Sequence, residues 1–205
     1  MKDKSNVLII TRILLFAFGI SLLMTVNALA AKIDFKDLAF SSALGEPSFF
    51  SSTGGGITFT PGANDSISPP SLWWDETDGF GVQYNYEQDE IEGHEYLELT
   101  FENPFVLESI FIADLFNERG YTEHGFYQLD DGPLVEFMAH PDQHLGDLGD
   151  NGDLTIDIGG VTVSSIRFTA PGFIDGEDHE FAVQAIVLLG SGLVGLAGIR
   201  KKFKS

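Results

Sequence analysis

The sequence YLELTFE at Tyr96–Glu102, followed by ESIFIADLF at Glu108–Phe116, decides the fold class. Leu97, Leu99 and Phe101 lie on one face of an extended chain, because successive side chains of a strand point to opposite faces. The second stretch repeats this alternation with isoleucines. Both stretches are therefore predicted to be half-buried β-strands.

The remaining β-rich segments are short and closely spaced, and none shows a helical period of 3.6 residues. Two dipeptides that favour tight hairpins, Asp131-Gly132 and Asn151-Gly152, lie between them. This spacing predicts an all-β chain with a single antiparallel β-sandwich, jelly-roll-like, over residues 31–182. The other expected strands are Lys32–Phe40, Ile57–Thr60, Gly81–Tyr86, Gly125–Asp130, Leu134–Met138, Leu154–Ile158, Val161–Ala170 and Glu180–Ile186.

The charge is unevenly divided along the chain. The formal net charge is −20, but the middle, residues 31–182, holds thirty of the 31 acidic residues and only four basic ones, a net −26. Such a domain repels nucleic acid and anionic lipid and favours cations or basic partners, although solubility alone also explains the charge. The chain has no cysteine, which excludes disulfides, thiol catalysis and cysteine-based metal sites.

The first thirty residues have the three zones of a secretory signal peptide. A basic region with Lys2, Lys4 and Arg12 precedes the apolar run Ile13–Val26. Ala28-Leu-Ala30 has the small-x-small pattern of a signal cleavage site, with Ala28 and Ala30 as the small residues. A permanent membrane span is the alternative, but this apolar run is short for one. We expect a mature chain that begins near Ala31.

The C-terminal segment, residues 183–205, is apolar and then basic. Val183–Ile199 is a run of 17 residues without a charge, and basic residues follow from Arg200 onward. This length is at the lower limit of a membrane-spanning helix, and the cations behind it are typical of a cytoplasmic end. A buried final strand is the alternative, because Phe181, Val183 and Ala185 alternate with their neighbours.

The stretch LLGSGLVGLAGIRKK closely resembles the C-terminal sorting signal of PEP-CTERM proteins, which are exported proteins of Gram-negative bacteria processed by exosortase. The glycine-containing helix of that signal matches Ile186–Ile199, and its basic cluster matches Arg200–Lys204. Its Pro-Glu-Pro motif is missing, since Val183-Gln-Ala185 stands at that place. The resemblance implies a membrane anchor and an exosortase-type partner. By this resemblance, the residues expected to carry the sorting and anchoring role are Leu188, Leu189, Gly190, Ser191, Gly192, Gly195, Arg200, Lys201 and Lys202.

The middle of the chain resembles the β-sandwich ectodomains that often precede this sorting signal. The matching stretches are DEI at Asp89–Ile91, YLELTF at Tyr96–Phe101, IADLF at Ile112–Phe116 and HEFAV at His179–Val183. This resemblance implies an architecture and no activity.

The densest acidic stretch, Glu87–Glu95, is a candidate calcium site. Carboxylate oxygens are the ligands that Ca²⁺ prefers, and Glu180 on the last expected strand could complete the set. The alternative is a solvated acidic loop, because carboxylates are abundant throughout the middle. The candidate ligands are Asp89, Glu90, Glu95 and Glu180.

Trp73 and Trp74 form the candidate ligand-binding pair. Both follow two prolines in a turn-rich region, where aromatic faces beside carboxylates can stack on sugars. The alternative is partial burial, which is the common state of tryptophan.

The sequence contains no assembled catalytic motif of the serine-hydrolase, phosphate-loop or zincin type. We therefore expect no enzyme, and an exported, membrane-anchored protein of the cell surface or the extracellular matrix of biofilms. It would face the periplasm from the inner membrane, or lie outside the cell after processing, with exopolysaccharide as a partner and no nucleic acid. The alternative is a carbohydrate-binding module with calcium as its cofactor, displayed in the same place.

Overall fold

The computed structural model describes residues 30–64, 68–84, 90–118, 121–141, 152–171 and 181–189. The compact unit considered below runs from Ala30 to Gly190. The predicted signal peptide up to Leu29, with Ala28, lies outside the described residues, as does the tail from Gly190 onward. Among the described residues, no helix has the length and apolar character needed to cross a membrane.

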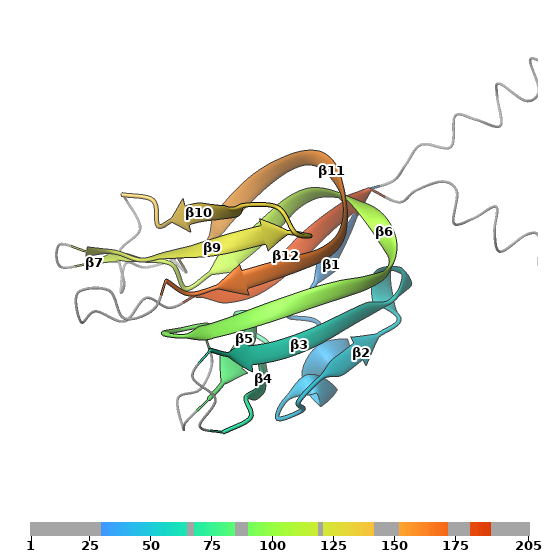
Figure 1. Ribbon diagram of the computed structural model, residues 1–205, viewed down its shortest axis with the longest axis horizontal. Coiled ribbons are helices and arrows are strands. Elements are labelled where there is room, and N and C mark those ends of the chain that lie inside the picture. The colour runs from blue at the N-terminus through green and yellow to red at the C-terminus, as the bar shows by residue number, and fades with distance from the viewer. Residues whose placement is uncertain are drawn as a thin grey trace, which may run out of the picture. The chain divides into compact units, whose positions relative to one another are not determined.

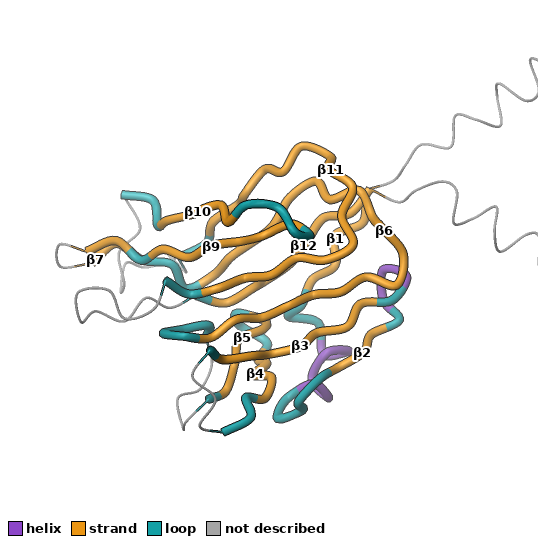
Figure 2. The backbone as a smooth tube through the Cα atoms, in the orientation of Figure 1, coloured by secondary structure: helices purple, strands orange, loops and turns teal. Residues whose placement is uncertain are grey.

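The unit is built almost entirely of antiparallel strands, which confirms the predicted all-β class (Figures 1 and 2). Two short 3-10 helices complete it, η1 (Leu38–Ala43) and η2 (Thr53–Gly55). The strands are β1 (Ala30–Asp34), β2 (Phe49–Ser51), β3 (Ile57–Ala63), β4 (Ser71–Asp75), β5 (Gly79–Gln83), β6 (Glu95–Ala113), β7 (Asn117–Glu118), β8 (Tyr121–Thr122), β9 (His124–Leu129), β10 (Leu134–Met138), β11 (Leu154–Thr169) and β12 (Ala182–Leu189).

Ten strands form one sheet in the order β10-β9-β11-β6-β12-β5-β4, with β1 on β12, β3 on β6 and β2 on β3. The small hairpin β7–β8 is separate. The centre is β6, which is 19 residues long. It pairs with β11 along one edge, while its other edge pairs first with β3 and then with β12.

The two strands predicted at 96–102 and 108–116 are thus one continuous strand, and so are those predicted at 154–158 and 161–170. Pro104 lies in the middle of β6, at the exposed place where the neighbouring strand changes. A proline lacks the N–H that a ladder needs, so it is tolerated where pairing is interrupted. The matching irregularity in β11 is a pair of register shifts between Asp157 and Ser165.

The sheet folds over on itself around an aromatic core. Phe59 of β3 and Phe80 of β5 are both fully buried, and their rings stack with centroids 4.3 Å apart. β3 borders the first part of β6, whereas β5 borders β12 beside the last part. These rings can meet only if the two halves of the sheet face each other. Phe35 and Phe40 pack edge-on against both rings.

The C-terminal apolar run begins as a strand, which corrects the prediction of a membrane-spanning helix that starts at Val183. Val183–Leu189 belongs to β12, and Leu188 pairs with Leu107 on one side and Ala31 on the other. Five consecutive residues, Ala182–Ile186, are buried. A strand covered on both faces is apolar at nearly every position, with Gln184 as the exception here, and therefore resembles a membrane segment in sequence. The predicted boundary at 182/183 moves to the end of β12.

Two further segments differ from the expected strands. Lys32–Phe40 is not one strand: β1 ends at Asp34, and Asp37 then caps η1 by accepting a hydrogen bond from the Ala39 N–H. The region of the two tryptophans is the edge strand β4 and not a turn. Its hairpin partner β5 had been expected two residues further along the chain.

Candidate functional site

Four aspartates gather where several strands end or begin, and we name them the carboxylate cluster: Asp75, Asp78, Asp114 and Asp153. Asp75 ends β4, Asp114 follows β6, and Asp153 precedes β11. These strand ends are adjacent because Leu154 pairs with Ile112, and Ala113 pairs with Ala182. The cluster therefore comes from segments that lie far apart in the sequence.

The turn between β4 and β5 fixes the first two members. One Asp75 carboxylate oxygen accepts hydrogen bonds from the N–H groups of Thr77 (2.7 Å) and Asp78 (2.8 Å). This is the local pattern by which aspartate stabilises a turn. Gly79 follows with φ of +100°, and a Cβ placed there would lie 2.6 Å from the Val183 carbonyl oxygen. Only glycine allows the turn to pack this closely on β12.

Asp78 and Asp114 interact through a side-chain hydrogen bond, and the surroundings raise the pKa of Asp78 above its usual 3.8. Burial is the main cause, and the negative charge of Asp75 adds to it. The hydrogen bond with Asp114 and the positive charge of Lys36 act in the opposite direction. Burial and the charge of Asp75 outweigh these two effects, so Asp78 holds a proton more readily than an isolated aspartate does.

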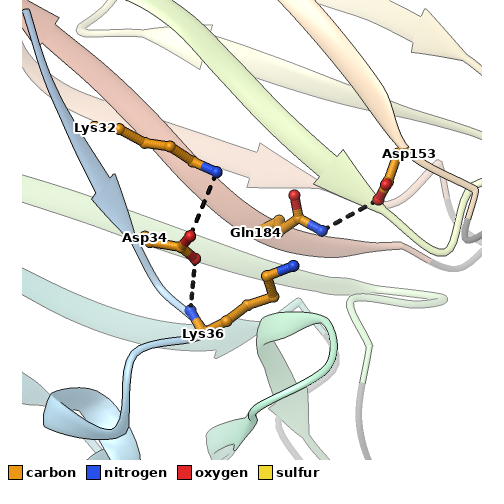
Figure 3. A network of polar contacts seen from close by, with 5 residues as sticks. All are labelled: Lys32, Asp34, Lys36, Asp153 and Gln184. Atoms are coloured by element: carbon orange, nitrogen blue, oxygen red, sulfur yellow. Dashed lines mark hydrogen bonds and ion pairs between the residues drawn. The ribbon is translucent and has the colours of Figure 1, made fainter.

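A polar network borders the cluster (Figure 3). Gln184 of β12 donates a hydrogen bond through Nε2 to Oδ1 of Asp153 over 3.1 Å. On β1, the Asp34 carboxylate accepts a hydrogen bond from the Lys36 N–H at 3.2 Å, and the Lys32 ammonium lies 3.3 Å from its other oxygen. Lys32 and Lys36 are two of the four basic residues in the acidic middle. They therefore balance part of the charge at this end.

The predicted calcium ligands are only partly within the described residues. Asp89 and Glu180 lie outside them. Glu95 is 3% exposed, and its carboxylate accepts a hydrogen bond from the Glu92 N–H at 3.1 Å. Across the described part of the chain, no group of three or more histidine, cysteine, aspartate or glutamate side chains is arranged to hold a metal ion. The four-residue calcium site stays a prediction.

The two tryptophans point to opposite faces of β4. Trp74 is 8% exposed, packs in the core and donates its indole N–H to the Phe35 carbonyl oxygen at 2.5 Å. Trp73 is half-buried and shares the outer face of β4 with Ser71 and Asp75. If an aromatic face contacts a ligand, the ring available for it is therefore that of Trp73.

The sequence alone does not identify the carboxylate cluster. Asp153 follows Asn151-Gly152, a dipeptide that alone explains a turn, and Asp114 appeared only within a strand. The backbone of Asp114 has φ of +56°, so the strand ends at this residue. One signal was present: Asp75, Asp114 and Asp153 directly adjoin apolar strands. In a chain with so many carboxylates, that signal does not distinguish them from the rest.

No family model matches this sequence. No curated protein matches it either. Among solved structures, it is similar to two crystal structures of an exo-β-1,3-galactanase from Phanerochaete chrysosporium, one with β-1,3-galactotriose and one with galactose. The identities are 14% and 13%, and the TM-scores are 0.35 and 0.38. The matches cover 71% and 68% of this chain but only 29% and 28% of the galactanase, so the chain spans less than a third of that protein.

Proposed function

We propose that this chain is an exported protein of the cell surface or extracellular matrix. In this proposal its domain is a non-catalytic, acidic β-sandwich of jelly-roll type, held at a membrane by the C-terminal tail. The observation that carries the proposal is the pairing of Ala30 with Leu189 on the adjacent antiparallel strands β1 and β12. The apolar segments on either side of the domain therefore join it at neighbouring positions, as expected for a domain presented from one end.

The extent of β12 limits how the tail can attach the domain to the membrane. With Val183–Leu189 in β12, the uncharged residues that remain before Arg200 are Gly190–Ile199, ten in all. As a helix they would be about 15 Å long, whereas the hydrocarbon core is about 30 Å thick. We therefore propose that the tail inserts into the membrane surface and does not span it. The basic residues behind it would contact anionic headgroups, each contributing about 1 kcal/mol.

The carboxylate cluster supports a structural role and not a catalytic one. The Asp75 carboxylate is engaged by two main-chain N–H groups, and that of Asp153 by the Gln184 amide. Carboxylates used in this way fix turns and strand ends. The partners that fit the proposal are the membrane, an exosortase-type enzyme and exopolysaccharide, in the periplasm or outside the cell.

The test is to produce the full chain in a Gram-negative host and to fractionate the envelope. We expect a membrane-bound protein that begins near Ala31 by mass spectrometry, keeps Arg200–Ser205 because the Pro-Glu-Pro motif is missing, and is cut by protease added to spheroplasts. Deleting residues 190–205 should release a folded domain into the soluble periplasmic fraction. A protein that keeps Met1 and stays in the cytoplasm would refute the proposal.

A second candidate function is a carbohydrate-binding module, favoured by one observation: Trp73 and Asp75 share the outer face of the edge strand β4. An aromatic ring beside a carboxylate can stack on a sugar and bind its hydroxyl groups. A glycan array with and without EDTA tests this candidate and the predicted calcium together. Trp73→Ala should abolish binding, and Phe50→Ala, another exposed aromatic on an edge of the sheet, is the control. Binding that persists in Trp73→Ala would exclude this surface.

A further inference from the structure

We infer that the end of the domain where β1 begins and β12 ends is a lipid-facing surface that lies against the bilayer. This inference rests on the proposed function and adds to it an orientation of the domain and a contact surface. Its evidence is the register of four strands, the distribution of charge between the two ends of the domain, and the length of chain that follows Leu189.

The strand register places both ends of the domain in one row. Ala30 pairs with Leu189, Leu189 pairs with Val106, and Val106 pairs with Thr162. The row therefore crosses β1, β12, β6 and β11 in turn. We call the part of the domain around this row the chain-exit end. β1 begins and β12 ends at this row, whereas β6 and β11 continue into the other half of the sheet, as the right side of Figure 1 shows.

The segments that form this row hold few charges, although the domain as a whole is strongly acidic; the carboxylates nearest to them are Glu102, beside Gly56, and Glu108, beside Gly160. No charged residue occurs in 30–31, 52–56, 103–107, 158–163 or 188–189. η2 belongs to this end, because a Cβ at Gly55 would lie 2.8 Å from the Phe105 ring. Val161 is 46% exposed beside the row, next to Gly159 and Gly160, which both have a positive φ. A surface with few charges and an exposed apolar side chain suits the boundary between headgroups and acyl chains.

The opposite end of the same strands carries the carboxylate cluster. From Ala182, beside Ala113 and the cluster, to Leu189 is seven steps along β12, which is about 23 Å. Electrostatic interactions in physiological salt decay over about 8 Å. With the chain-exit end against the bilayer, the cluster lies more than two decay lengths from anionic headgroups. The reverse orientation would bring the cluster into contact with them.

The tail restricts the domain to this orientation. From Leu189 to the first cation, Arg200, only ten residues intervene, which reach at most about 35 Å when fully extended. If Arg200 lies at the headgroups and the apolar residues before it enter the membrane, little chain is left as a linker. The chain-exit end must then lie at the surface itself.

The absence of cysteine allows this inference to be tested with single-cysteine labels on the full chain. Val161→Cys places an environment-sensitive fluorophore at the chain-exit end, and Thr77→Cys places it in the exposed turn beside the cluster. The probe membrane is a vesicle of equal parts phosphatidylethanolamine and phosphatidylglycerol. We expect the label at position 161 to shift to shorter emission wavelengths on vesicle binding and to be quenched by nitroxide-labelled lipid. The label at position 77 should do neither.

A second variant measures the contribution of the surface to binding. Val161→Asp should weaken vesicle binding of the full chain roughly tenfold, the loss expected for one small apolar side chain, and Thr77→Asp is the matched control. If the chain floats with vesicles but the labels at 161 and 77 behave alike, the lipid-facing surface is wrong while membrane attachment stands. If the full chain does not float with vesicles, both proposals fail.

Discussion

Phe59 and Phe80 stack face to face in the core, with their ring centroids 4.3 Å apart and their planes inclined by 25°. Phe59 pairs with Leu99 through β3, and Phe80 pairs with Val183 through β5. The stack is therefore a direct contact between the two halves of the folded sheet. It is also the centre of the aromatic cluster that Phe35 and Phe40 complete.

Replacing Phe80 by alanine should lower the free energy of unfolding by about 3–5 kcal/mol, the usual cost of removing a buried phenylalanine ring. Urea denaturation of a fragment of residues 30–190 measures this loss. Phe50→Ala is the control, because Phe50 is 52% exposed and its loss should cost less than about 0.5 kcal/mol. Equal losses for the two variants would contradict the folded-over sheet.

Replacing Gly79 by alanine should be strongly destabilising, by at least about 2 kcal/mol, since a Cβ must displace the backbone of β12 in addition to adopting a positive φ. Gly45→Ala is a matched control, because Gly45 also has a positive φ but has no atom within 4 Å of a Cβ. We expect Gly45→Ala to cost about 1 kcal/mol. A thermal melt that shows the same shift for both variants would refute the close packing of Gly79 on Val183.

The pairing of β12 within the sheet predicts where the folded domain ends. A fragment of residues 30–190 should fold and melt cooperatively, with the circular dichroism of a β protein. A fragment that ends at Ala182 should not, because β6, β1 and β5 all lose their pairing with β12. A cooperative melt of the shorter fragment would show that Val183–Leu189 is dispensable and free to join a membrane helix.

The pKa of Asp78 predicts a pH dependence of stability. Because the pKa is raised in the folded state, the native protein binds a proton at pH values where the unfolded chain has released it. The free energy of unfolding therefore falls as the pH rises from about 3.8 through the raised pKa. Asp78→Asn should remove this decrease and stabilise the protein at neutral pH, by less than about 1 kcal/mol because the site is half open to solvent.

Urea denaturation of the residue 30–190 fragment across the acidic range measures this effect. The control is Asp157→Asn, which removes an exposed carboxylate from β11 and should leave the decrease in place. Parallel stability curves for the wild type and Asp78→Asn would contradict a proton held at Asp78.

The strands could be predicted from the sequence wherever a segment alternates between the core and the surface. In β6, Leu97, Leu99 and Phe101 are buried and alternate with more exposed neighbours as predicted, and the turn at Asp131-Gly132 joins β9 and β10 as expected. The pattern did not identify a strand that is buried on both faces or one that directly follows prolines. Val183–Leu189 has no alternation of polarity, and Ser71–Asp75 was assigned to a turn because two prolines precede it.

The sequence by itself determined the class of the protein, because period-two patterning, turn dipeptides and the lack of a helical period are local properties of the chain. It also determined the division of charge between an acidic middle and basic ends. Only the tertiary structure decided that β12 belongs to the sheet, that Phe59 meets Phe80, and that four aspartates gather at one end. The reason is physical: an apolar run is stable in lipid or between two layers of a sheet, and long-range pairing selects between the two.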